Sequence, residues 1–299
     1  MEKDCGGPDR QRTCLLVLGM RSGTSALARC LSLLGAGLPA HLLPGNHSNE
    51  TGHWEPARIV ELNDRILAAV GSRWDALLDP DLNLLAHDVR IGFRDELTDT
   101  VAREYGDAPF IVLKEPRIGR LVPFYVEALR DAGYELRVIV TRRDPVAVAR
   151  SFEKRDGNGL GHALLLWISY ALSVEHSTRA LERTFVSYDE LMLDPLRVLS
   201  SASAALGIAY PRPLPDAIEA IRTYLSSELY HNKPGEHSAP DFVADAHDAL
   251  DRLAGRDPSA MSVLDRQRNA VHRLVGRFGT LIGRDTSLSR LAELAAESG

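Results

Sequence analysis

The stretch that most constrains the fold is residues 13–31, TCLLVLGMRSGTSALARCL. An apolar run ends at Gly19, a short polar segment follows, and apolar residues then return at helical spacing. This order predicts a buried strand, a tight loop and a helix. Free N–H groups at the start of such a helix favour an anion, and Arg21 with the hydroxyls of Thr24 and Ser25 adds charge and donors. A phosphate group is therefore the expected ligand.

The loop differs from the nucleoside-triphosphate loop G-x-x-x-x-G-K-[ST], in which a lysine reaches the terminal phosphates and a hydroxyl holds magnesium. Gly19 and Gly23 are only four residues apart, and Thr24 stands where that lysine would be. The pattern therefore disfavours an NTPase. Glycine-containing turns also occur in doubly wound domains for purely structural reasons, so this stretch alone leaves a structural turn as an alternative.

Length and composition set the class of protein. The chain has 299 residues, 44% of them hydrophobic, which suffices for one large α/β domain or two modest ones. Residues 1–12 are polar, and the longest apolar stretch, 163–172, is too short to span a bilayer. We therefore expect a cytoplasmic protein without a membrane span. A net charge of −6 argues against general nucleic-acid binding, and Cys5, Cys14 and Cys30 match no metal spacing.

Strands and helices alternate along the first two thirds of the chain. Beyond the first strand, buried strands are expected at 108–113, 136–140 and 184–186, with helices between them. Such alternation implies an α/β fold with a parallel sheet of about four to five strands and helices on both faces. Ligands of such sheets bind beyond the carboxyl ends of the strands.

The expected organisation has three parts. We predict a flexible tail over 1–12, the α/β core over 13–210 and a helical C-terminal extension packed on the core over 211–299. Apolar stripes in the extension would serve the core or a homodimer contact. Within the core, residues 35–52 form a long loop without periodicity, and long loops in compact domains tend to be functional. The loop ends at Gly52-His53-Trp54-Glu55.

Three motifs resemble those of the sulfotransferases that use 3′-phosphoadenosine 5′-phosphosulfate (PAPS). Residues 19–27, GMRSGTSAL, resemble their 5′-phosphosulfate loop. Residues 142–151, RRDPVAVARS, resemble their 3′-phosphate motif, in which an arginine at a strand end is followed eight residues later by a serine. The segment YDEL at 188–191 resembles the Y-E-D-L segment, whose tyrosine lies by the nucleotide. The resemblance covers roughly residues 13–208.

This resemblance implies a P-loop-like sulfotransferase fold and PAPS as co-substrate, without a metal. It implies transfer of the sulfuryl group to a hydroxyl or amine of a small molecule, glycan or lipid. The implied cofactor-binding residues are Arg21, Ser22, Gly23, Thr24, Ser25, Arg143, Ser151 and Tyr188.

In-line sulfuryl transfer needs a cation where charge develops on the bridging oxygen. Lys114, at the end of the second strand, resembles the lysine that the family supplies there, and Arg21 replaces the usual loop lysine. The acceptor hydroxyl also needs a general base. Many family members have a histidine just after the strand-end lysine, whereas this chain has Glu115. We favour Glu55 as the base, with Glu115 and His53 as alternatives.

Other interpretations remain at this stage. A nucleotide-dependent kinase would bind ATP with magnesium, and a non-catalytic nucleotide-binding or scaffold protein would bind the cofactor without turnover. Residues 231–235 are the only candidate for the family's late loop over the 3′-phosphate. Trp167 and Tyr170 share a helix face and are expected in the core rather than against an adenine ring.

Overall fold

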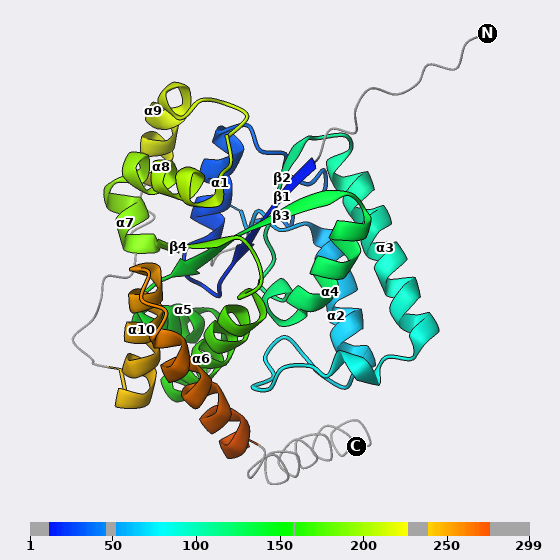
Figure 1. The fold of residues 1–299 in the computed structure, drawn as a ribbon, viewed down its shortest axis with the longest axis vertical. Coiled ribbons are helices and arrows are strands. Elements are labelled where there is room, and N and C mark those ends of the chain that lie inside the picture. Colours follow the sequence, from blue (N-terminus) through cyan, green and yellow to red (C-terminus); the bar gives the residue numbers. More distant parts are fainter. Residues whose placement is uncertain (1–11, 46–51, 158, 227–238, 276–299) are drawn as a thin grey trace, which may run out of the picture.

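The computed structural model describes residues 12–45, 52–157, 159–226 and 239–275 (Figure 1). Its centre is a sheet of four parallel strands in the order β2-β1-β3-β4, which confirms the predicted α/β class. The strands are β1 (Arg12–Leu18), β2 (Phe110–Leu113), β3 (Tyr134–Arg142) and β4 (Arg183–Ser187).

Strand β1 is central and buried on both faces. Cys14, Leu16 and Leu18 enter one core cluster, whereas Leu15 and Val17 enter the other. This alternation follows from the period of two residues in a strand. The helices that cover the first face are α2 (Ala57–Ala69), α3 (His87–Tyr105) and α4 (Ile118–Asp131).

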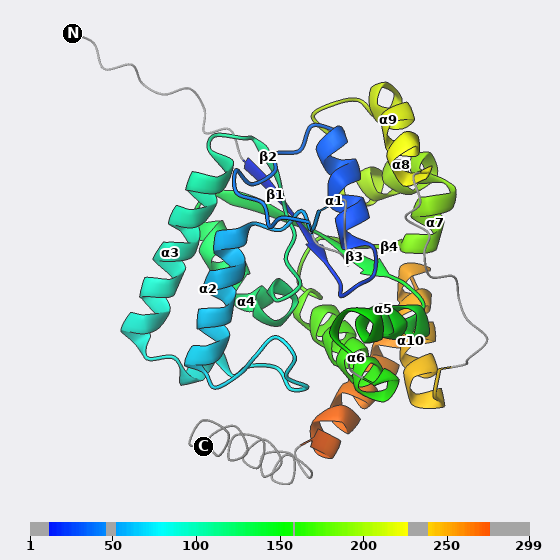
Figure 2. The same ribbon diagram turned by 180° about the vertical axis from the view of Figure 1, so that it is seen from behind.

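Helix α1 and three helices that follow β4 cover the second face, as Figure 2 shows from behind. They are α1 (Thr24–Leu33), α7 (Tyr188–Leu193), α8 (Pro195–Leu206) and α9 (Leu214–Ser226). A third cluster lies near the carboxyl ends of the strands and joins α5 (Pro145–Asp156), α6 (Leu160–Ser177), α10 (Asp241–Ala254) and the helical residues 260–275.

Several boundaries differ from the sequence-based expectation. The sequence pattern predicts a helix over 95–105, whereas α3 begins at His87, because its first two turns are mostly exposed and therefore carry no apolar stripe. Strand β3 is longer than expected at both ends, and Arg12, assigned to the tail, already belongs to β1. The short 3-10 helix η1 (Leu82–Leu84) lies in the stretch 71–87, for which the sequence pattern indicates only irregular or partly helical structure.

Helices that follow residue 210 pack against two of the clusters described above. Helix α9 joins the cluster around α1, and α10 joins the cluster around α6. Among the described residues, none of the helices combines the length and apolarity that crossing a membrane requires. The candidate loop 231–235 and the tail residues 1–11 lie outside the described residues.

Candidate functional site

The loop from β1 to α1 has an unusual backbone. Gly19 and Gly23 have φ values of 136° and 86°, and Arg21 between them has φ of 54°. A Cβ atom on Gly19 would lie 2.3 Å from the hydroxyl oxygen of Thr141, and one on Gly23 would lie 2.1 Å from the ring of Tyr188. Both positions therefore require glycine, for their backbone conformation and for the close approach of a neighbouring side chain.

The start of α1 is suited to an anion. Its N-cap, Gly23, offers no side-chain hydrogen bond, and the first turn contains no acidic residue. No acidic or capping side chain of α1 itself therefore neutralises the N–H groups and the positive dipole at the start of this helix. Ser22, in contrast, is buried, and its hydroxyl lies 2.5 Å from that of Thr141, which donates to the carbonyl of Leu18 at 3.1 Å. Through this contact the Ser22 side chain connects the loop to β3.

Lys114 is the first residue after β2, and its ammonium group joins three segments of the chain. Its Nζ atom donates to the carbonyl of His53 at 2.9 Å and to the hydroxyl of Ser25 at 3.2 Å, and it forms an ion pair with the carboxylate of Glu55. Only 3% of the Lys114 side chain and 10% of the Glu55 side chain are exposed. Three of the predicted site residues thus surround the predicted catalytic lysine.

His53 lies in a cationic environment. Burial lowers the pKa of its imidazole, and the charges of Lys114, Arg21 and Arg155 lower it further, whereas Glu55 opposes them. The imidazole is therefore neutral at neutral pH. The carbonyl of His53 also accepts a hydrogen bond from Ser25 at 3.2 Å, so that its backbone links α1 to Lys114.

Glu115 lies in a separate polar network. Its fully buried carboxylate accepts bonds from the amide of Asn63 at 2.6 Å and from the guanidinium of Arg117 at 2.6 Å. Tyr125 in turn donates to Asn63 at 2.7 Å. Burial raises the pKa of Glu115, and the Arg117 charge opposes this shift. The carboxylate therefore anchors the turn after Lys114 and does not join the group around the ammonium.

The second predicted motif directly follows β3. Asp144 caps α5 by accepting a hydrogen bond from the amide of Ala147 at 2.7 Å. Arg143 stacks over the ring of Tyr188 with 4.5 Å from its guanidinium carbon to the ring centroid. The Tyr188 ring therefore lies against both Gly23 of the loop and the guanidinium of Arg143.

The two predicted anion motifs meet at Ser151. This buried serine of α5 accepts hydrogen bonds from the Nε and Nη2 atoms of Arg21 at 3.0 and 2.7 Å. Sequence spacing assigned Arg21 to one motif and Ser151 to the other. The structure places them in direct contact, although 130 residues separate them in the sequence.

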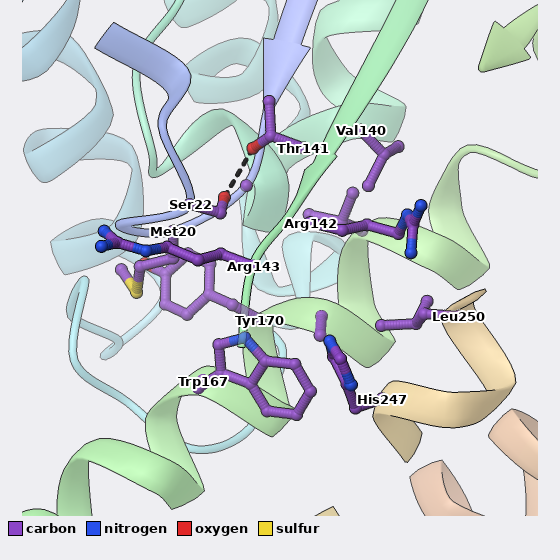
Figure 3. A pocket seen from close by; sticks show the side chains of 13 residues that line it. Met20, Ser22, Val140, Thr141, Arg142, Arg143, Trp167, Tyr170, His247 and Leu250 are labelled. Carbon is purple, nitrogen blue, oxygen red and sulfur yellow. Dashed lines mark hydrogen bonds between the residues drawn. The ribbon is translucent and has the colours of Figure 1, made fainter. Parts of the chain in front are cut away.

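A pocket lies at the ends of β1 and β3 (Figure 3). Arg142 and Arg143 extend to opposite sides of it. Trp167 and Tyr170 line it while remaining almost fully buried in the core, as expected for core residues. The other side chains that line it are Met20, Ser22, Val140, Thr141, Ala171, Val174, His247 and Leu250.

Helix α10 contributes to this pocket in a way that the sequence pattern did not predict. His247 and Leu250 line it, and Asp251 forms an ion pair with Arg142, whose pKa is lowered by burial. Residues 241–254 match no motif, and only their apolar stripe indicated that they pack somewhere. Within the described ranges, no group of three or more His, Cys, Asp or Glu side chains is arranged to hold a metal ion.

No protein-family model and no curated protein matches the chain. Several solved structures are similar to it, among them two sulfotransferase domains. The sulfotransferase domain from the curacin biosynthetic pathway has a TM-score of 0.47 and 15% identity, over 81% of this chain and 99% of that chain. The sulfotransferase domain from the Synechococcus PCC 7002 olefin synthase has a TM-score of 0.43 and 18% identity, over 81% of this chain and 90% of that chain.

Proposed function

We propose that the protein is a sulfotransferase that moves the sulfuryl group of PAPS to a hydroxyl or amine of a small molecule, glycan or lipid. The observation that carries this proposal is the order of residues at one edge of the sheet. Gly19, Lys114, Arg143 and Tyr188 each directly follow one of the four parallel strands. Two cationic side chains, those of Lys114 and Arg143, thereby follow strands at the edge of the sheet where parallel sheets commonly bind ligands, and Arg21 of the first motif donates to Ser151 of the second.

Such an arrangement suits a nucleotide with anionic groups at both its 3′ and 5′ positions. The N–H groups at the start of α1, with Arg21, Thr24 and Ser25, would hold the 5′-phosphosulfate. Arg143 and Ser151 would hold the 3′-phosphate, because the planar guanidinium matches phosphate oxygens and the serine hydroxyl can still donate. Tyr188 would lie against the nucleoside.

The reaction would be an in-line displacement at sulfur. The acceptor oxygen or nitrogen forms the new bond to sulfur, and the bond from sulfur to the bridging oxygen breaks. That oxygen leaves on adenosine 3′,5′-bisphosphate with the bond's electron pair. Lys114, already fixed by three acceptors, would stabilise this charge. Glu55 would take the proton of the acceptor, and neutral His53 is the alternative base beside it.

The first test is calorimetric titration of the purified protein with adenosine 3′,5′-bisphosphate in EDTA and, separately, with ATP and magnesium. We expect binding of the bisphosphate without metal, followed by transfer from labelled PAPS in a screen of acceptors. Binding of magnesium ATP alone would refute the proposal in favour of a kinase. Binding of the bisphosphate without transfer to any acceptor, or to water, would indicate a non-catalytic protein.

Variants separate the roles of the proposed residues. Arg143→Ala should raise the apparent KM for PAPS by about 10- to 100-fold, because a hydrogen bond to a charged group contributes about 1.5–3 kcal/mol. The KM for the acceptor should change little, and equal effects on both would remove Arg143 from the cofactor site. Arg197→Ala, on the exposed surface of α8, is the matched control.

Glu55→Gln should lower kcat while the bisphosphate still binds, and normal turnover would refute its role as base.

A further inference from the structure

Trp54 has a backbone conformation that is rare for a bulky residue. Its φ is 56°, in the left-handed region, where a side chain crowds the backbone. Such a conformation persists only where surrounding contacts hold it. The sequence motifs gave Trp54 no role, although it stands between His53 and Glu55.

This conformation determines where the His53 carbonyl points. The angle φ of Trp54 is the rotation about its N–Cα bond, and it therefore orients the peptide group that joins His53 to Trp54. The carbonyl of that peptide accepts hydrogen bonds from Lys114 at 2.9 Å and from Ser25 at 3.2 Å. The next residue, Glu55, supplies the carboxylate partner of the same ammonium group. One left-handed residue thus brings two acceptors to Lys114.

The Trp54 ring is held by helix α1. It packs against the core cluster that contains α1, and the guanidinium carbon of Arg29 lies 4.9 Å from its centroid. Arg29 is four residues after Ser25, so both side chains lie on the same face of α1. One face of α1 therefore holds the Trp54 ring through Arg29 and, one turn earlier, contacts the His53 carbonyl through Ser25. The backbone of Trp54 orients that same carbonyl.

Backbone pairing fixes the residues that follow Trp54. The amide of Leu43 donates to the carbonyl of Glu55 at 2.8 Å, and the amide of Ala57 donates to that of His41 at 2.9 Å. These bonds hold the chain after Trp54, and the stacking on Arg29 holds the ring. Together they provide the contacts that the left-handed conformation requires.

We propose that Trp54 is a positioning residue for Lys114: its clamped, left-handed backbone aims the His53 carbonyl at the ammonium group and at Ser25. The inference rests on the proposed function, in which Lys114 acts at the bridging oxygen. Trp54 itself touches neither the reacting atoms nor the cofactor in this account. Its effect passes through the orientation of one peptide group.

The test compares Trp54→Gly with Trp54→Ala, because both remove the ring and only glycine adopts positive φ freely. The assay is PAPS cleavage by water, which yields sulfate and adenosine 3′,5′-bisphosphate and needs no identified acceptor. We expect Trp54→Gly to cleave PAPS about fivefold faster than Trp54→Ala, since strain of this kind depopulates the active conformation by roughly that factor. Trp54→Phe, which keeps an aromatic ring on Arg29, should lose the least activity.

Two controls separate positioning from simple loss of packing. In a Lys114→Met background the difference between glycine and alanine at position 54 should disappear, because the carbonyl no longer has an ammonium group to orient. At Glu61, an exposed position inside α2, the Glu61→Gly variant should be less stable than the Glu61→Ala variant. Affinity for the bisphosphate should stay within about threefold in all three Trp54 variants, because the 3′-phosphate contacts remain.

The outcomes distinguish the two proposals. If the wild-type protein binds no bisphosphate and cleaves no PAPS, the proposed function fails. If the wild-type protein does both, equal or slower cleavage by Trp54→Gly than by Trp54→Ala overturns the positioning role alone. Persistence of the difference in the Lys114→Met background also overturns it.

Discussion

The ion pair between Lys114 and Glu55 gives a prediction that is independent of any ligand. Both side chains are almost completely withdrawn from water, with 3% and 10% exposed. Lys114→Met leaves the Glu55 carboxylate buried without its cation, and breaking a buried pair in this way costs about 3–5 kcal/mol. Glu55→Gln keeps an oxygen for the ammonium and should cost less, about 1–3 kcal/mol.

The double variant Lys114→Met with Glu55→Gln removes both charges together. We therefore expect its loss of stability to be about 2 kcal/mol smaller than the sum of the single losses, since residues in direct contact couple by about 0.5–3 kcal/mol. Urea denaturation at pH 7, followed by circular dichroism, measures all three values. Asp99→Asn is the matched control, because its i,i+4 pair with Arg103 has side chains that are 70% and 63% exposed. Its loss should be below about 1 kcal/mol.

The refuting result is additivity. If the double variant loses the sum of the single losses to within about 0.5 kcal/mol, the two groups do not interact in the folded protein. A cost for Lys114→Met as small as that of Asp99→Asn would show that the ammonium group is solvated. Either result would remove the geometric basis for assigning Lys114 to the bridging oxygen.

Three further predictions follow from other contacts. Burial lowers the pKa of His53 in the folded protein. The stability that this histidine contributes is therefore present above its ordinary pKa of 6.5 and is lost as the pH falls through the lower folded-state pKa. His53→Gln should flatten the fall in unfolding free energy between pH 7 and pH 5, and an unchanged slope would contradict this. Gly23→Ala places a methyl group 2.1 Å from the Tyr188 ring at a positive φ, and it should destabilise the protein by more than about 1 kcal/mol in urea melts. Asp251→Asn should lower the melting temperature, because it removes the carboxylate partner of the mostly buried Arg142. An unchanged melting temperature would show that the pair is incidental.

Local sequence patterns predicted the sheet and the strand-end residues well. Each buried strand has a run of apolar residues, and a polar residue or glycine follows each run, so that the sequence alone places Lys114 and Arg143 at one edge of the sheet. The start of α5 is also indicated locally, because Asp144 and Pro145 are residue types with strong preferences for the first positions of a helix.

The contacts between distant segments could not be predicted in this way. Nothing local in Arg21 or Ser151 indicates that they touch, because the contact depends on how α5 crosses the loop before α1. The left-handed backbone of Trp54 is equally hidden, since tryptophan is a residue for which positive φ is not expected. Glu115 resembled a base in sequence, yet only the fold shows that Asn63 and Arg117 occupy its carboxylate.

The pairing of Arg142 with Asp251 also bears on when the site becomes complete during synthesis. The roughly one hundred residues between them take on the order of 5–20 s to translate at about 5–20 residues per second. Once β4 has been made, the sheet edge carries two adjacent arginines, and the carboxylate that pairs with Arg142 has not yet been made. A nascent chain therefore exposes a more basic edge than the finished protein, and α10 must dock before that edge acquires its final charge.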